Sequence, residues 1–118
     1  MKLTELAGAL GLEAAVGALE GVEVTGAYVS DLLSDVMAHA EKGMVWITLQ
    51  VHQNIVAVAT LKELAAIVIV AGREPESDTI EKAEQQKVPI LRTKLTAFEI
   101  AGRMYELGLR STVPGGQS

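Results

Sequence analysis

The segment Gly72-Arg73-Glu74-Pro75 combines residue types that bind anions, and it directly follows a continuous apolar run. The glycine allows close approach to the backbone, and the Arg73 guanidinium can pair with a phosphate or carboxylate beside the free amides of a helix N-terminus. The alternative is an ordinary strand-to-helix turn in which Arg73 pairs with Glu74 or Glu76. Glu74, Glu76 and Asp78 resemble a metal cluster, but acids are expected in a first helical turn. Both interpretations of the segment stay open; Gly72, Arg73 and Glu74 are included in the predicted ligand-binding set, and no metal is expected.

His52 and Asn54 lie at the start of another expected helix. An imidazole at this place could hydrogen-bond a ligand or act as a general base, because it exchanges a proton near neutral pH. In the alternative interpretation Asn54 is the N-cap of the helix and His52 hydrogen-bonds the backbone of the loop. Both residues are included in the predicted ligand-binding set.

Ser30, Asp31 and His52 are the residue types of a hydrolytic triad, but Ser30 has no Gly-x-Ser-x-Gly context and is expected to cap a helix. The chain also lacks the glycine-rich phosphate loop of the P-loop proteins and the Gly-x-Gly-x-x-Gly fingerprint of dinucleotide-binding domains. The sequence therefore predicts no catalytic residue and no bound cofactor. An enzyme that uses Asp31 and His52 is the least favoured of three hypotheses for this chain.

The elements that must position these residues follow from apolar periodicity and capping signals. Thr96 and Glu99 form a capping box, and the run from Ala66 to Ala71 is typical of a strand buried on both faces. Gly26 interrupts an extended segment as a bulge or a close approach, whereas Ser30 and Asp78 are expected N-caps. We expect helices at 4–10, 30–40, 54–64, 78–86 and 96–107, and strands at 22–29, 44–49, 66–71 and 88–91. Residues 12–16 fit either a further helical turn or a short strand, and the strand is favoured.

From residue 44 onward strands and helices alternate, which predicts an α/β fold with a mainly parallel sheet and helices on both faces. Open parallel sheets bind ligands at the carboxyl ends of their strands, so the polar loop residues are expected to meet at one edge. The predicted ligand-binding residues are Ser30, Asp31, Thr48, His52, Asn54, Gly72, Arg73, Glu74 and Thr93.

Composition limits the class of protein further. A chain of 118 residues predicts one domain, here residues 1–109, and the aperiodic residues 110–118 are expected to form a disordered tail. The net charge of −5 disfavours a nucleic-acid binder, and the lack of cysteine excludes thiolate chemistry. The apolar stretch 55–72 contains Lys62 and Glu63, so it is not expected to cross a membrane. Because the start lacks a signal peptide, a cytoplasmic location is expected.

Three stretches of the sequence resemble the DRTGG domain family. They are Thr-Leu-Gln-Val-His-Gln-Asn-Ile-Val-Ala from Thr48, Ala-Ile-Val-Ile-Val-Ala-Gly-Arg-Glu-Pro from Ala66, and Thr-Ala-Phe-Glu-Ile-Ala-Gly from Thr96. The segment 24–32 is also similar to the family's first strand and turn. The family's Asp-Arg pair falls at residues 52–54 and is missing, and its Thr-Gly-Gly falls at residues 71–73, where only Gly72 matches.

This resemblance implies a three-layer α/β/α fold similar to the N-terminal domain of HPr kinase, without its kinase domain. It also implies a regulatory or accessory module, of the kind attached elsewhere to phosphotransacetylase or CBS-domain pyrophosphatase, where it would sense adenine nucleotides. Our first hypothesis is therefore a dimeric regulatory domain that binds a nucleotide or another small anion.

The second hypothesis is a protein-interaction adaptor or dimerisation module with no ligand of its own. It rests on the lone Trp46 and on a surplus of small apolar residues, more than a monomer of this size needs to bury: Ala57, Ala59, Ala65, Ala97 and Ala101.

Overall fold

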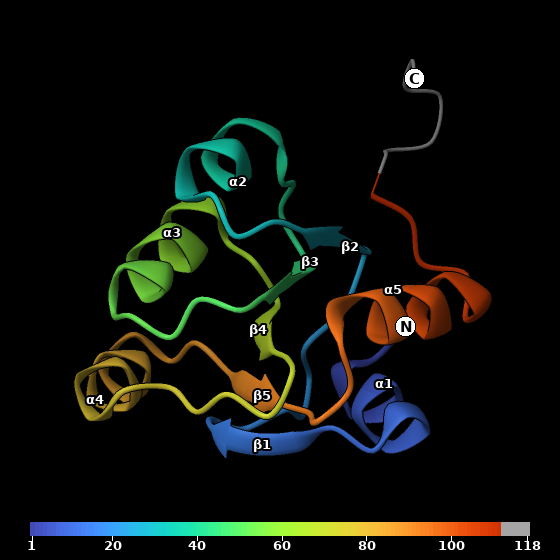
Figure 1. Ribbon diagram of the computed structural model, residues 1–118, viewed down its shortest axis with the longest axis horizontal. Helices are drawn as coiled ribbons and strands as arrows, with labels where there is room; N and C mark the ends of the chain where they lie inside the picture. The colour runs from blue at the N-terminus through green and yellow to red at the C-terminus, as the bar shows by residue number, and fades with distance from the viewer. Residues whose placement is uncertain (112–118) are drawn as a thin grey trace.

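The computed structural model describes residues 1–111, and the rest of the expected disordered tail, residues 112–118, lies outside the described part. This part contains five strands in one sheet, in the order β1-β5-β4-β3-β2 (Figure 1). The strands are β1 (Glu13–Val16), β2 (Gly26–Val29), β3 (Met44–Thr48), β4 (Ala66–Ile69) and β5 (Ile90–Arg92). The helices are α1 (Leu3–Leu10), α2 (Leu33–His39), α3 (Asn54–Lys62), α4 (Ser77–Gln86) and α5 (Ala97–Glu106).

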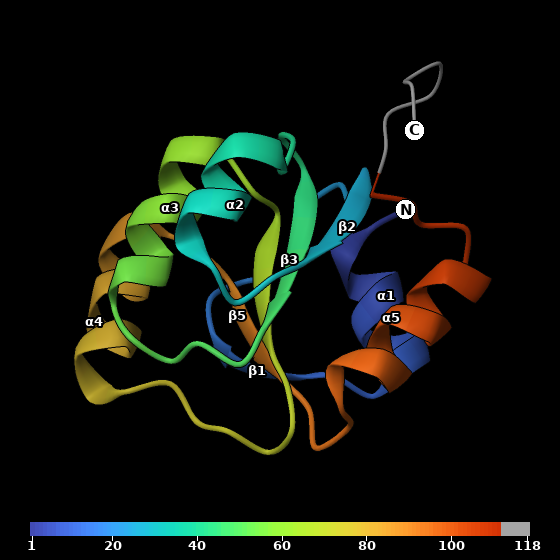
Figure 2. The same ribbon diagram turned by 45° about the horizontal axis from the view of Figure 1, so that its top comes forward.

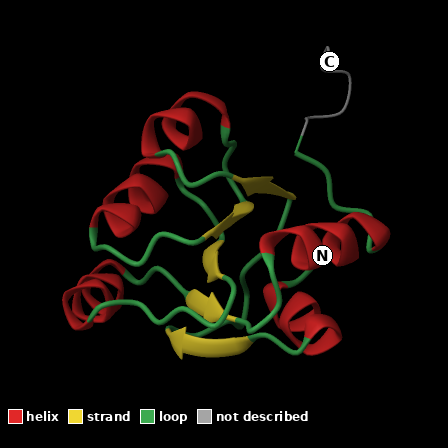
Figure 3. Cartoon of the chain, viewed as in Figure 1, coloured by secondary structure: helices red, strands yellow, loops and turns green. Residues whose placement is uncertain are grey.

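The sheet lies between two layers of helices, with α2, α3 and α4 on one face and α1 and α5 on the other (Figures 2 and 3). Alternate residues of β3 serve the two faces: Val45 and Ile47 belong to the core with α1 and α5. Met44 and Trp46 belong to the core with α2, α3 and α4. Two cores on one sheet explain why β3 and β4 are buried throughout and almost entirely apolar. The predicted α/β fold class is confirmed.

Strands β2 to β5 run parallel, as the alternation of strands and helices predicts. Strand β1 is the exception, because it pairs antiparallel with β5 and places Glu13 opposite Arg92. The amino end of β1 therefore lies at the carboxyl end of β5.

Trp46 is fully buried, and its indole Nε1 donates a hydrogen bond to the Ser30 carbonyl oxygen at 2.7 Å. It therefore belongs to the core and is not part of an exposed surface, contrary to its use as support for an adaptor. Ala59 and Ala65 are also buried. The apolar residues that remain exposed lie elsewhere, most of all on α5.

Three residues expected or considered as helix N-caps do not have that position, although α3 begins at Asn54 as predicted. Ser30 does not cap α2: its hydroxyl oxygen accepts from the Leu32 amide at 3.1 Å in a local turn, and the helix begins at Leu33. Asp78 lies inside the first turn of α4, whose N-cap is Glu76. Asn54 is already the first residue of α3, preceded by Gln53 as N-cap. By contrast, Thr96 caps α5 as predicted, because its hydroxyl oxygen accepts from the Glu99 amide at 3.3 Å.

Gly26 is a point of close approach between distant parts of the chain. A Cβ atom built on it would lie well inside van der Waals distance of the Arg110 carbonyl oxygen, which also accepts a hydrogen bond from the Ala27 amide at 3.1 Å. The close-approach interpretation of Gly26 is therefore the correct one. Arg110, expected to begin the tail, is held against the edge strand β2.

None of the helices within residues 1–111 is both long enough and apolar enough to span a membrane.

Candidate functional site

The loops that follow β2 and β3 are joined by the side chain of Asp31. Its Oδ1 accepts hydrogen bonds from the Thr48 hydroxyl at 2.8 Å and from the Leu49 amide at 2.7 Å. Gln50 adds a third link, because its side-chain amide donates to the Asp31 carbonyl oxygen at 2.9 Å. Thr48 is buried, so its hydroxyl needs such a partner. Asp31 and Thr48, both predicted ligand-binding residues, here hold two strand ends together.

The loops after β4 and β5 join the same edge. Arg73 donates from a guanidinium nitrogen to the Leu49 carbonyl oxygen at 2.8 Å. The Gly72 amide donates to the Thr93 carbonyl oxygen at 3.0 Å, and the Ala71 amide donates to Leu95 at 2.8 Å. The carboxyl ends of the four parallel strands therefore meet, as the sequence predicts.

A cavity of about 300 Å³ opens at this edge, beside the ends of β4 and β5. Four of the predicted residues line it, namely Gly72, Arg73, Glu74 and Thr93. Three further lining residues are Glu13, Arg92 and Lys94. The cavity thus has three cationic and two acidic side chains in its wall, which suits a small anion that can exchange with the carboxylates.

Arg92, Lys94 and Glu13 line the cavity but are outside the predicted ligand-binding set. Arg92 ends β5 and Lys94 follows it closely, so their place at a strand end is a signal in the sequence that indicates them. Glu13 reaches the cavity only because β1 is antiparallel to β5. Arg92 forms an ion pair with Glu74 and a longer one with Glu13 at 3.7 Å.

His52 and Asn54 lie outside the residues that line this cavity. The His52 ring Nδ1 faces the Asn54 amide at 3.4 Å, as in the structural interpretation of this histidine, and both residues are exposed. Within residues 1–111 no hydrogen bond joins Asp31 to His52, and Asp31 Oδ1 instead accepts from Thr48 and Leu49. Nor does that part of the chain bring three His, Asp or Glu side chains together where they could hold a metal ion.

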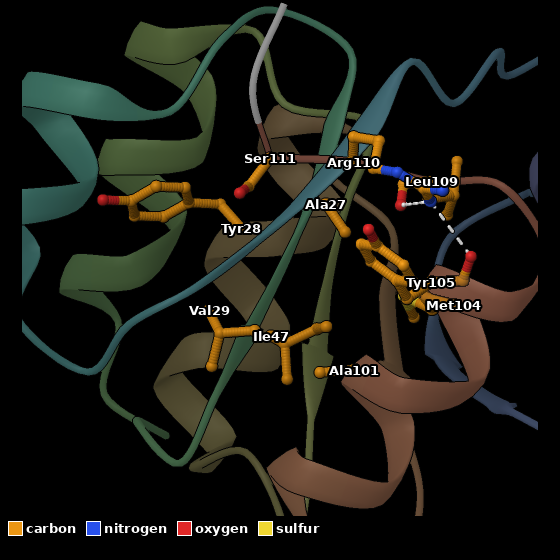
Figure 4. Close-up of a pocket in the computed structure, with 10 residues that line it drawn as sticks. All are labelled: Ala27, Tyr28, Val29, Ile47, Ala101, Met104, Tyr105, Leu109, Arg110 and Ser111. Carbon is orange, nitrogen blue, oxygen red and sulfur yellow. Dashed lines mark hydrogen bonds between the residues drawn. The ribbon is translucent and has the colours of Figure 1, made fainter. Parts of the chain in front are cut away.

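A second cavity of about 430 Å³ lies between β2 and α5 (Figure 4). Its wall is largely apolar and contains Val29, Ile47 and Ala101. Among residues 1–111, Arg110 is the one charged residue that lines this cavity, and its guanidinium lies 3.6 Å from the centre of the Tyr105 ring. This arrangement offers an anion a single cation, whereas three cationic side chains line the cavity of Arg73. The sequence could not reveal it, since it depends on the return of residue 110 to β2.

Comparison with known families decides what kind of domain this is. The model of the DRTGG domain matches residues 13–107. The chain belongs to the DRTGG domain family. No curated protein sequence matches it significantly.

One solved structure with the same fold is the regulatory region of Clostridium perfringens pyrophosphatase, with its CBS and DRTGG domains, in complex with the activator diadenosine tetraphosphate. The TM-score is 0.64 and the sequence identity is 16%. The match covers 93% of the present chain but only 48% of that chain. At this identity the likeness concerns the fold, and the DRTGG chain described here spans about half the length of that regulatory region.

The turn after β4 contains two consecutive residues with positive φ. Ala71 and Gly72 have φ angles of 59° and 72°, the left-handed conformation that glycine adopts at least cost. Alanine at the first of these positions is strained.

We expect Ala71→Gly to raise the free energy of unfolding by about 0.5–1 kcal/mol. The left-handed conformation costs an alanine about 1–2 kcal/mol, and the extra freedom of glycine in the unfolded chain offsets part of the gain. Urea denaturation measures the change. The matched control is Gly72→Ala, which should destabilise the protein. A less stable Ala71→Gly protein would contradict the argument.

A small polar network joins β2 to α2. The Tyr28 hydroxyl donates to the Asp35 carboxylate at 3.0 Å, and the His39 ring Nδ1 lies 3.0 Å from Asp35 Oδ1. A hydrogen bond from Ser30 is the main cause that lowers the pKa of Asp35, helped by Tyr28 and His39 and opposed by partial desolvation. Desolvation and the neighbouring Asp35 raise the pKa of Tyr28.

The lowered pKa of Asp35 predicts a pH-dependent contribution to stability. The folded state favours the ionised carboxylate, so the contribution is present above the ordinary pKa of 3.8 and is lost as the pH falls through the lower folded value. We expect the difference in unfolding free energy between wild type and Asp35→Asn to shrink below about pH 4. Denaturation curves measured from pH 7 to pH 2 give this difference directly. A difference that does not change with pH would contradict the prediction.

Proposed function

We propose that this DRTGG domain is a non-catalytic regulatory module that binds a small anionic ligand, an adenine nucleotide, in the cavity at the ends of β4 and β5. The observation that supports it is the gathering of Arg73, Arg92 and Lys94 around one cavity in a chain of net charge −5. Cations concentrated in this way attract a phosphate group against the overall charge of the chain.

The cavity wall allows a ligand phosphate to replace a carboxylate of the protein. The side chains of Arg92 and Glu74 are 37% and 63% exposed, so their ion pair contributes little to stability and can be replaced by a ligand phosphate. Arginine recognises phosphate with the same paired geometry that it uses for a carboxylate. A Cβ atom at Gly72 would meet nothing within 4 Å, which leaves room for a ligand against the backbone.

The nucleotide class of ligand is suggested by the structural relative. The pyrophosphatase regulatory region is described with diadenosine tetraphosphate as its activator. That ligand has several phosphates, and a cavity with three cationic side chains suits such a group.

Calorimetric titration and thermal unfolding with AMP, ADP, ATP, diadenosine tetraphosphate and pyrophosphate test the proposal. A ligand at a hundred times its dissociation constant adds about 2.7 kcal/mol, which raises the melting temperature by several degrees. We expect Arg73→Ala and Lys94→Ala to weaken binding at least tenfold. Lys42→Ala is the control, because Lys42 pairs with Glu63 away from the cavity. Equal losses in all three variants, or no binding by any probe, would refute the proposal.

The second candidate is a protein-interaction or dimerisation module without a ligand. The observation that favours it is the exposure of large apolar side chains on α5, where Phe98 is 87% and Tyr105 is 61% exposed. A protein that binds none of the anions but associates through this helix would support the second candidate over the first.

A further inference from the structure

The cavity between β2 and α5 lies where the side chains on the two elements are small. The strand presents Ala27 and the helix presents Ala101, and both line the cavity. Larger residues hold the helix on the rest of the sheet, since Ile100 and Met104 are buried in the same core as Ile47. The two methyl groups leave a space of about 430 Å³ beside them. A space of this size is typical of sites that bind a small organic molecule.

One end of this cavity is apolar. Val29, Ile47 and Ala101 come together there from β2, β3 and α5 (Figure 4). Ile47 is fully buried, whereas Val29 on the edge strand is 48% exposed, so the apolar wall continues from the core to the solvent. A hydrocarbon that lies against this wall removes apolar surface from water, which favours its binding.

Arg110 lies at the other end of the cavity and is held in place by three kinds of contact (Figure 4). Its guanidinium lies over the Tyr105 ring. Its Nη1 donates to the Tyr105 carbonyl oxygen at 3.0 Å and to the Leu109 carbonyl oxygen at 2.8 Å. Its own carbonyl oxygen accepts from the Ala27 amide at 3.1 Å. A side chain arranged in this way loses little freedom when a ligand binds.

The anchoring of Arg110 uses only one edge of its guanidinium. Nη1 has its acceptors, but the N–H groups of Nε and Nη2 have none within residues 1–111. Parallel N–H groups of a guanidinium bind both oxygens of one carboxylate. A single cation balances a single negative charge, whereas a more highly charged group would be poorly compensated beside an apolar wall.

We propose that this cavity binds an organic acid with one carboxylate and an unbranched apolar body. The carboxylate pairs with Nε and Nη2 of Arg110, and the hydrocarbon lies against Val29, Ile47 and Ala101. The cavity shares no lining residue with the anion cavity at the ends of β4 and β5. The proposal therefore stands or fails independently of the proposed function.

Calorimetric titration of the full chain with butyrate, hexanoate and octanoate tests the apolar part of the site. We expect each added methylene group to strengthen binding about two- to fourfold, because it covers more of the apolar wall. Hexanamide has the same body without the charge. We expect it to bind about tenfold more weakly than hexanoate, because hydrogen bonds to a charged group are stronger.

Two variants separate the charge from the space. Arg110→Met removes the donors but retains an apolar stem, so hexanoate should bind about tenfold more weakly while hexanamide binds as before. Ala101→Leu fills the cavity and should weaken the binding of both compounds. Arg103→Met is the matched control with unchanged affinities, because Arg103 lies on the same helix but does not line this cavity.

Nuclear magnetic resonance locates the bound acid, and we expect the largest amide shifts at Val29 and Ala101. Circular dichroism verifies that every variant is folded. The proposal is overturned if octanoate shows no saturable binding at millimolar concentration, or if the affinity does not depend on chain length. Equal losses of hexanoate binding in Arg110→Met and Arg103→Met would also overturn it.

Discussion

Trp46→Ala is expected to lower the free energy of unfolding by about 3–5 kcal/mol. The side chain is fully buried in the middle of β3, and its removal leaves a large cavity among residues that cannot all collapse to fill it. The substitution also removes the hydrogen bond from Nε1 to the Ser30 carbonyl oxygen. Urea denaturation followed by far-ultraviolet circular dichroism measures the loss without relying on the fluorescence of this single tryptophan.

Trp46→Phe separates the two causes. Phenylalanine retains much of the apolar volume but cannot donate to Ser30, so we expect the larger part of the loss to be recovered. A Trp46→Ala protein within 1 kcal/mol of wild type would show that the core on the α2–α4 side does not depend on this side chain.

Gly26→Ala is expected to destabilise the protein by about 1–3 kcal/mol. The new methyl group would press on the Arg110 carbonyl oxygen, which is backbone and cannot move aside like the end of a flexible side chain. Residues 109–111 must then shift, which weakens the hydrogen bond from the Ala27 amide and the packing of the buried Leu109. Denaturation gives the energy, and faster hydrogen exchange of the Ala27 amide locates the change.

Gly8→Ala is the matched control for this substitution. Gly8 lies within α1 with open space around its Cβ position, so alanine should stabilise the helix by about 0.5–1 kcal/mol. Similar effects of the two substitutions would mean that the contact between Gly26 and Arg110 does not determine the cost.

Local pattern was sufficient for much of the fold. The unbroken apolar run at β4 predicts a strand with two covered faces, and two cores do cover it. The N-terminal ends of helices were harder to predict, because several neighbouring side chains can hydrogen-bond the free amides of a first helical turn. Ser30 illustrates this, since its hydroxyl closes a turn with Leu32 before α2 begins. The partner and direction of β1 could not be predicted, because pairing between distant strands leaves no mark in the local pattern.

The candidate site also contains residues that the sequence predicts and residues that only the structure reveals. Gly72, Arg73, Glu74 and Thr93 follow recognisable strands, and the rule that ligands bind at strand ends places them at one cavity. Asp31 and Thr48 were chosen for their chemistry, but they bond to each other, which a sequence does not show. Glu13 could not be predicted as a site residue, because it reaches the cavity only through the antiparallel pairing of β1 with β5.

The pairing of β1 with β5 also affects the order in which the domain can fold. Strand β1 is synthesised before β5, so Glu13 has no strand partner until Arg92 has been added. During synthesis β1 therefore stays unpaired, whereas β2, β3 and β4 can already pair with one another. Such long-range pairing slows folding and leaves an unpaired strand exposed to other chains. The pairing of β1 with β5 completes one edge of the sheet. The same pairing brings Glu13 into the wall of the anion cavity.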